Sequence, residues 1–361
     1  MAGGSGTRLW PVSRAGQPKQ LVPFIPGPEG RPRSLLQIAA ERLEGLVPEQ
    51  QRTICTAEAY REQIETMLPS FRGDRLLGEP CPRDTVNAVG FAAAVFAKQD
   101  PDAIFAVLTA DQLIQPHDRY LRAMETGFSI VEADPSRFVS FGITPTEPAT
   151  GYGYIEIGDP LAGDPSGLGF EIARFVEKPD AERARHYLES GRFLWNAGMF
   201  VFHARTFLDR LAAHLPDSHA GLMRIQEAWG TPDQRAVLDA VYPTLPKVSV
   251  DYAIMEPCAS DPAVSLTGVC MDVDWLDVGS WPSFADTLEP DASGNRASGC
   301  TPALHNSSGN VVVSDDPEHT VALVGCEDLV VVRTDRATLV MPRDRAQDLK
   351  ALHAELPEAL R

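Results

Sequence analysis

Cysteines are few in this chain, and they are not paired at short spacing. Six cysteines are scattered over 361 residues without a CxxC motif, and the eight histidines show no HxxxH spacing. Structural zinc sites and disulfide frameworks depend on such spacings, so the pattern argues against both and against a zinc enzyme. It is typical of a reducing compartment, and we expect a cytoplasmic protein.

Long apolar runs are also missing. No stretch of about 18 apolar residues occurs, so we expect no membrane-spanning helix. The first residues are glycines and not a basic stretch followed by an apolar one, which argues against a secretory signal. With 43% hydrophobic and 23% charged residues, the composition is that of a globular protein with a buried core.

Positive charge is scarce, since 32 Lys and Arg face 50 Asp and Glu, and the net charge is -18. Nucleic-acid binding needs a basic face that displaces counterions, so we expect no nucleic-acid partner. A local group of cations can still bind a small phosphorylated ligand. Such a group occurs near the start, where Arg8, Arg14 and Lys19 precede the first acidic residue, Glu29.

Up to about residue 290, short β-rich runs alternate with helical patterns, which is typical of an α/β sheet. We predict a buried, parallel strand at 104–108, further strands at 138–143 and 199–202, a helix capped by Ser34, a helix between Asp180 and Gly191, and mostly helix over 204–242. From 309 to 341, four Val/Leu runs separated by turns predict a small β module, whose runs could be coils of a short β-helix, and a helix over about 345–356. We therefore predict one domain at 1–290 and a second at 291–361.

The glycine-rich segment near the start is the most informative motif. Gly3, Gly4 and Gly6 let backbone N–H groups approach a polyphosphate closely, and successive N–H groups in such a turn form an anion-binding concavity. Arg8 follows directly, and Lys19 adds a second cation suited to neutralising a triphosphate. Taken alone, the segment could also be a flexible chain end, and it matches neither the P-loop nor the GxGxxG pattern.

Extended to residue 24, the motif GGSGTRLWPVSRAGQPKQLVPF resembles the signature of sugar-1-phosphate nucleotidyltransferases, with a tryptophan and PKQ similar to the mannose-1-phosphate guanylyltransferase branch. Similar segments follow in order: LTADQ (108–112), TGYGYI (150–155), FVEKP (175–179), WNAGMFVF (195–202), VDYAIME (250–256) and WLDVGSW (275–281). The resemblance implies a Rossmann-like, glycosyltransferase-A-like mixed α/β sheet with a short left-handed β-helix. It also implies transfer of GMP from GTP to α-D-mannose 1-phosphate, giving GDP-mannose and pyrophosphate.

Two aspartates are the candidate metal ligands. Asp111 follows the apolar run 104–108, and the carboxyl ends of strands face the ligand crevice in an open α/β sheet. Asp277 precedes Val278-Gly279, and by position alone either aspartate could be a turn or cap residue. The resemblance implies that both hold Mg²⁺ against the phosphates, and this cation takes one or two carboxylates and keeps several waters.

The resemblance also implies the residues that bind each substrate. For the nucleotide these are Gly3, Gly4, Ser5, Gly6, Thr7, Arg83, Asp84, Thr85 and Asp111, with Arg8 and Lys19 as catalytic residues. For the sugar they are Gly151, Tyr152, Gly153, Glu177, Lys178, Asn196 and Gly198. Without the resemblance, the TGYGY glycines could mark a tight strand or bulge, and EKP a solvated turn.

The segment implied for the base departs from the family pattern. EPCPRDTVNA (79–88) stands where the family has EPxGRNTAPA, so Pro82, Asp84 and Asn87 differ, and Gln112 replaces the usual histidine. Asp84 could accept hydrogen bonds from guanine N1–H and N2–H₂, or it could cap the following helix. Two alternatives therefore stay open: glucose 1-phosphate with UTP or dTTP, and a non-catalytic regulatory homologue that binds nucleotide sugars. Exposed β edges after residue 309 would suit a homodimer contact.

Only Met1 and Ala2 precede the glycine loop, whereas family members carry an apolar strand there. Because a strand normally needs about five or six residues, we expect the true start to lie upstream. The alternative is that Met1 is genuine and the loop is poorly anchored. The intact mass of the native protein distinguishes the two.

Arg8→Ala tests the proposed charge neutralisation. Negative charge builds on the phosphates during transfer, so we expect kcat to fall roughly 10²–10³-fold while KM for the nucleotide rises far less. Steady-state pyrophosphate release measures both constants. Near-normal turnover would refute the role of Arg8.

Overall fold

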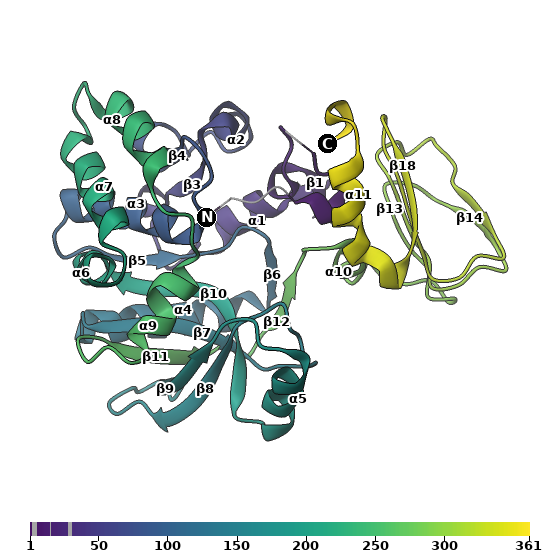
Figure 1. Ribbon diagram of the computed structural model, residues 1–361. Helices are drawn as coiled ribbons and strands as arrows, with labels where there is room; N and C mark the ends of the chain where they lie inside the picture. Colours follow the sequence, from purple (N-terminus) through teal and green to yellow (C-terminus); the bar gives the residue numbers. More distant parts are fainter. Residues whose placement is uncertain (2–5, 15, 28–30) are drawn as a thin grey trace. The chain divides into compact units, whose positions relative to one another are not determined.

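The computed structural model describes residues 1, 6–14, 16–27 and 31–361 (Figure 1). Contacts divide the chain into two compact units. Unit 1 contains residues 1, 43–109 and 114–275, and unit 2 contains residues 2–42, 110–113 and 276–361. This division differs from a single boundary near residue 290, because the N-terminal segment packs with the C-terminal module inside unit 2.

A mixed sheet forms the centre of unit 1, with its described strands in the order β5–β10–β7–β11–β9–β8. The strands are β5 (Ile104–Val107), β7 (Arg137–Ile143), β8 (Tyr154–Pro160), β9 (Gly169–Val176), β10 (Phe193–His203) and β11 (Ser265–Cys270). β7 and β11 are parallel, whereas β5 runs antiparallel to β10 with Val107 opposite Phe200. The prediction of a parallel strand at 104–108 is therefore wrong for the pairing described, because an apolar run carries no information about the direction of its partner.

Helices cover both faces of this sheet (Figure 1). They are α3 (Asp84–Gln99), α4 (His117–Ala133), α5 (Ala181–Ser190), α6 (Ala204–His214), α7 (Pro216–Ala228) and α8 (Gln234–Val241). The shorter helices α2 (Arg61–Met67) and α9 (Glu256–Cys258) also belong to unit 1. Alternate side chains of β10 point to opposite faces, so Phe200 and Phe202 pack with α3, α6 and α7, whereas Met199 and Val201 pack with α4. The α/β class expected from the sequence is confirmed. Strands β3 (Ile54–Ala57) and β4 (Leu76–Glu79) form a separate parallel pair.

Local sequence signals fix several helix ends. Ser34 accepts the N–H of Gln37, whose side chain accepts the N–H of Ser34, so a capping box begins α1 (Leu35–Glu41). Asp180 accepts the N–H of Arg183 at the start of α5, and Gly191 ends that helix at a φ of 64°. These predicted ends, and the helical stretch 204–242, are confirmed.

Unit 2 contains the C-terminal β module. The helices and strands of unit 2 are β1 (Pro23–Ile25), β2 (Arg33–Ser34) and α1 of the N-terminal segment, followed by α10 (Trp281–Ala285), β13 (Arg296–Ser298), β14 (Ala303–His305), β15 (Val311–Ser314), β16 (Ala322–Val324), β17 (Leu329–Arg333), β18 (Thr338–Pro342) and α11 (Leu349–Glu355). Strands β13, β15 and β17 pair in parallel, as do β14 and β16, so successive coils stack into a short β-helix. Strand β18 closes the larger sheet in antiparallel fashion. The closing helix is shorter than predicted, because 343–348 forms a 3-10 turn.

Two buried tryptophans fix the N-terminal segment within unit 2. The indole N–H of Trp281 donates to the carbonyl of Trp10 at 2.9 Å, and that of Trp10 donates to the carbonyl of Leu360 at 2.7 Å. Leu9 shares a hydrophobic cluster with Val311 of the β module. The segment that carries Arg8 is thus packed on the C-terminal module. Within the described residues, no helix combines the length and apolar character needed to cross a bilayer.

Candidate functional site

Lys19 brings the two predicted metal ligands together in unit 2. Its Nζ lies 3.0 Å from Oδ2 of Asp111 and 4.0 Å from Oδ1 of Asp277, and it donates to the carbonyl of Val278 at 3.2 Å. Lys19 is only 8% exposed. A buried ammonium group needs anionic partners to offset its lost hydration, and the two carboxylates supply them.

Backbone pairing positions the two aspartates. Asp111 directly precedes β6 (Gln112–Gln115), Asp277 ends β12 (Asp274–Asp277), and these two strands pair with each other. The N–H of Val278 donates to the carbonyl of Asp111 at 3.0 Å. A Cβ on Gly279 would lie 3.2 Å from Oδ2 of Asp277 and 3.4 Å from Nη2 of Arg8. The glycine therefore leaves room for the Arg8 guanidinium beside Asp277.

The end of the glycine loop packs on Lys19. Gly6 has a φ of 59°, in the left-handed region that favours glycine, and a Cβ there would lie 2.6 Å from Oγ of Ser13 and 2.9 Å from Cβ of Lys19. Thr7 and Arg8 follow in a 3-10 turn, where Arg8 is exposed. The remaining predicted loop residues, Gly3, Gly4 and Ser5, lie outside the described residues.

The electrostatics of this cluster favour a bound cation. Burial and the neighbouring Asp111 carboxylate raise the pKa of Asp277, whereas Lys19 and Arg8 lower it. Two carboxylates that share a site repel each other unless positive charge lies close to both. Mg²⁺ prefers carboxylate oxygens, so the donor set of Asp111 and Asp277 fits a hard divalent cation.

Asn196 organises the predicted sugar-binding residues in unit 1. Its Nδ2 donates to Oδ1 of Asp251 at 2.9 Å, and its Oδ1 accepts from Oγ of Ser140 at 3.1 Å and from the N–H of Gly198 at 3.0 Å. Gly198 has a φ of 67° within an irregularity of β10. The N–H of Asn196 donates to the carbonyl of Gly153 at 2.8 Å, so the TGYGY and WNAGM segments are joined.

Glu177 and Lys178 belong to the same cluster. The Glu177 side chain is 6% exposed and pairs with the Lys178 ammonium, and Lys178 has a φ of 44°. A Cβ on Gly153 would lie 2.6 Å from Oε2 of Glu177, so any other residue there would displace the Glu177 carboxylate. The N–H of Glu177 donates to Oε1 of Glu256 at 3.1 Å. The alternative of a solvated EKP turn does not hold for Glu177.

Aromatic side chains pack beside these residues. Tyr152 makes edge-to-face contacts with Trp195 at 5.2 Å and Trp275 at 5.0 Å between ring centroids. Trp195 and Met199 are buried core residues. A Cβ on Gly151 would meet nothing within 4 Å, so no close approach requires a glycine at this position.

The predicted base-binding segment is tied to residues 243–250. The Arg83 guanidinium donates to the carbonyl of Pro243, Oγ1 of Thr85 accepts the N–H of Val250 at 2.8 Å, and Nδ2 of Asn87 donates to the carbonyl of Pro246 at 2.6 Å. Asp84 is the first residue of α3, has a φ of 63° and accepts the N–H of Thr85 at 2.9 Å. Its carboxylate thus binds in the first helical turn, while the residue stays exposed.

Asp251 and Glu256 were missed by the sequence analysis. A π-helical turn over Asp251–Met255 directs Asp251 to Asn196, and Glu256 follows to hold Glu177. Such turns occur frequently at functional sites. The signal available was a pair of acids within the family-like segment VDYAIME. Burial and the negative charge of Glu177 raise the pKa of Asp251 to about 6.

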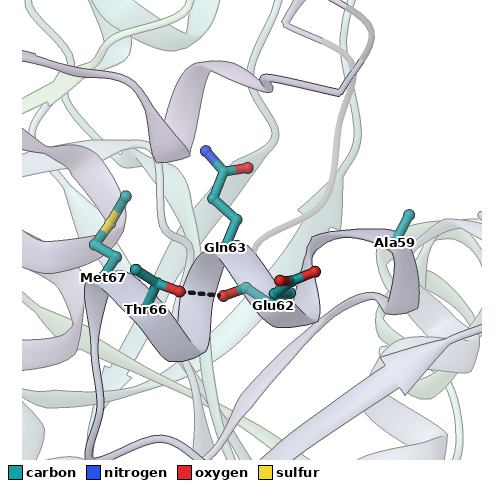
Figure 2. A pocket seen from close by; sticks show the side chains of 5 residues that line it. All are labelled: Ala59, Glu62, Gln63, Thr66 and Met67. Carbon is teal, nitrogen blue, oxygen red and sulfur yellow. Dashed lines mark hydrogen bonds between the residues drawn. The ribbon is translucent and has the colours of Figure 1, made fainter.

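An open pocket along α2 contains none of the predicted site residues. Its lining consists of Ala59, Glu62, Gln63, Thr66 and Met67, and the Thr66 hydroxyl donates to the carbonyl of Glu62 at 2.8 Å (Figure 2). The hydroxyl bond is internal to the helix. We assign no function to this pocket.

Known proteins resemble the whole chain. Residues 1–293 match the family described as nucleotidyl transferase, and residues 305–356 match the MannoseP isomerase/GMP-like beta-helix domain. Mannose-1-phosphate guanylyltransferase from Klebsiella pneumoniae is 38% identical over 97% of this chain and 71% of its own length. The enzyme of the same name from Escherichia coli K12 is 36% identical, again over 97% of this chain and 71% of its own.

A solved structure from Thermus thermophilus, described as a mannose-1-phosphate geranyltransferase, has a TM-score of 0.83 and 32% identity, covering 98% of this chain and 97% of its own. A mannose-6-phosphate isomerase from Helicobacter pylori has a TM-score of 0.57 at 23% identity, covering 73% of this chain and 96% of its own. The second likeness concerns the fold alone.

The raised pKa of Asp251 predicts a pH-dependent stability. The folded protein holds the Asp251 proton more tightly than the unfolded chain, so the contribution of Asp251 to the free energy of unfolding should fall as pH rises from about 4 to about 6, by on the order of 1–3 kcal/mol. Asp251→Asn removes this dependence, because the amide does not titrate in this range. Its oxygen can still accept from Asn196, so the contact is kept. Urea unfolding across this range should show a growing advantage for the variant.

The exposed residue Asp159 supplies the control, since Asp159→Asn should leave the pH profile of wild type unchanged. A difference between wild type and Asp251→Asn that is constant with pH would contradict the shifted pKa.

Proposed function

Since the chain belongs to the nucleotidyl transferase family and, within it, to the mannose-1-phosphate guanylyltransferases, we propose that it transfers GMP from GTP to α-D-mannose 1-phosphate. The products are GDP-mannose and pyrophosphate. The contact of Lys19 with both Asp111 and Asp277 carries the proposal, because it assembles the charges that a triphosphate and its metal require.

The reaction is an in-line substitution at phosphorus. A phosphate oxygen of the sugar phosphate forms a bond to the α-phosphorus, and the bond from that phosphorus to the bridging oxygen breaks as pyrophosphate leaves. The attacking oxygen is already anionic, so a covalent protein intermediate is unnecessary, and catalysis consists of positioning and charge stabilisation. Arg8 and Lys19 neutralise negative charge on the phosphates. Asp111 and Asp277 would hold Mg²⁺, which would supply further neutralisation of the phosphate oxygens.

The cluster around Asn196 binds the sugar phosphate. Glu177 accepts hydrogen bonds from sugar hydroxyls, Asn196 can both donate and accept, and Lys178 pairs with the sugar phosphate. Gly151, Tyr152, Gly153 and Gly198 complete this set of sugar-binding residues. This assignment is supported by the burial of Glu177 and by the contacts that join Gly153, Asn196 and Glu177.

The glycine loop (Gly3, Gly4, Ser5, Gly6 and Thr7), with Arg83, Asp84, Thr85 and Asp111, binds the nucleotide. An exposed carboxylate at Asp84 favours guanine over adenine, because guanine presents two adjacent donors. Residues 291–361 form the module through which two copies pair. Val324 and Val340 are 71% and 60% exposed on strands β16 and β18, which suits such a contact.

Pyrophosphate release with each NTP and a panel of sugar 1-phosphates tests the function. We expect the highest kcat/KM with GTP and mannose 1-phosphate, loss of activity with a chelator, and recovery with Mg²⁺. Asp111→Asn and Asp277→Asn should each lower kcat by at least about 10²-fold, because each removes a charged ligand. Asp335→Asn, at an exposed ion pair with Arg14, is the matched control. The proposal would be refuted if no combination of NTP and sugar 1-phosphate released pyrophosphate. Activity with UTP or dTTP alone would keep the reaction type but change the nucleotide substrate.

Glu256 is proposed as a positioning residue for the sugar side. Glu256→Ala removes the acceptor that holds the Glu177 N–H, so KM for mannose 1-phosphate should rise about 2–10-fold with little change in KM for GTP. Glu256→Gln keeps an oxygen acceptor and should restore most of the affinity. Equal effects of the two variants, or equal changes in both KM values, would argue against positioning.

A further inference from the structure

We propose that His214, Cys258 and Asp261 bind a divalent transition-metal ion such as Zn²⁺ or Co²⁺. One ligand atom from each side chain lies within 4.8 Å of the other two. The described residues contain no second group of this kind by the same measure. The three residues belong to unit 1 and share no member with the proposed phosphate or sugar sites.

Three neighbouring pieces of chain supply the ligands. His214 is the last residue of α6, Cys258 is the last residue of α9, and Asp261 lies in the turn that follows, where its N–H donates to the carbonyl of Cys258 at 3.2 Å. Nε2 of His214 already lies 2.9 Å from Oδ2 of Asp261. Cys258 is only 2% exposed, so its sulfur faces the protein and not bulk water. Small side-chain movements would therefore suffice to close the three atoms around one ion.

The ligand types select a particular class of metal. Imidazole nitrogen, thiolate sulfur and carboxylate oxygen are the three kinds of zinc ligand, and three protein ligands leave a fourth position for water. Mg²⁺ prefers oxygen and binds thiolates poorly, so it does not compete for this set. Binding converts the Cys258 thiol to a metal-bound thiolate and releases one proton to solvent.

Arg210 supplies the positive charge beside the Asp261 carboxylate in the structure. Its Nη1 lies 2.9 Å from the same Oδ2 of Asp261 that contacts His214. A guanidinium and a metal ion cannot both have full use of one carboxylate oxygen. Removing Arg210 should consequently strengthen metal binding, whereas a cluster that is only an ion-pair network gives no reason for such a gain.

Cobalt titration of the full chain tests the site. With millimolar Mg²⁺ present to occupy oxygen-rich sites, we expect one equivalent of Co²⁺ to bind and to show near-ultraviolet absorption from thiolate-to-cobalt charge transfer. Cys258→Ser should abolish this absorption, and Asp261→Asn should weaken binding at least about tenfold. Cys270→Ser, at a half-buried free thiol elsewhere in unit 1, should leave it intact.

Arg210→Gln provides the second readout and should tighten Co²⁺ and Zn²⁺ binding several-fold. Thermal unfolding with EDTA checks that each variant folds. The proposal is overturned if wild type shows no charge-transfer absorption, if Cys258→Ser keeps it, or if folded Arg210→Gln binds the metals no more tightly.

Discussion

The buried ammonium group of Lys19 lies between the carboxylates of Asp111 and Asp277, and it holds the proposed phosphate-binding cluster together. Without Lys19, the carboxylates of Asp111 and Asp277 would repel each other without a nearby positive charge to offset the repulsion. The raised pKa of Asp277 reflects its burial and this repulsion. Neighbouring features serve this contact. Gly6 lets the loop approach Lys19 closely, and Gly279 leaves space beside Asp277.

The proposed sugar-binding cluster around Asn196 follows the same principle with different groups. Here an amide, Asn196, lies between an acid on the π-helical turn and the backbone of TGYGY, while Lys178 offsets the charge of Glu177. Polar side chains that are buried in this way need nearly all of their hydrogen-bond partners. Groups that satisfy one another in this way hold each other in place, and such preorganisation favours positioning as the source of catalysis.

The sequence predicted the local roles of residues better than their contacts with distant residues. Ser34, Asp180 and Gly191 act locally, so their roles as helix ends followed from neighbouring residues alone. The contact of Lys19 with both aspartates joins distant segments, and only the family resemblance could suggest it. The direction of β5 was wrong because hydrophobicity specifies burial and not the orientation of a neighbour.

Other features depended on backbone shape that composition does not reveal. Asp251 reaches Asn196 because a π-helical turn rotates it there, and a short run of sequence gives little warning of such a turn. His214 and Cys258 meet only after α6 and α9 have packed, so a search for short ligand spacings could not pair them. Glu256 likewise acts on a residue far from it in sequence.

The tryptophan contacts of unit 2 have a consequence for the order of folding. Trp10 is made early on the ribosome, yet its partners Trp281 and the β-helix valines emerge only after most of unit 1 has been synthesised. Lys19 can meet Asp111 earlier, but the packing of Leu9 and Trp10 is complete only after these later partners have been made. Contacts of such long range are slow to close. The packing of the N-terminal segment is thus completed only when synthesis of the chain is nearly finished.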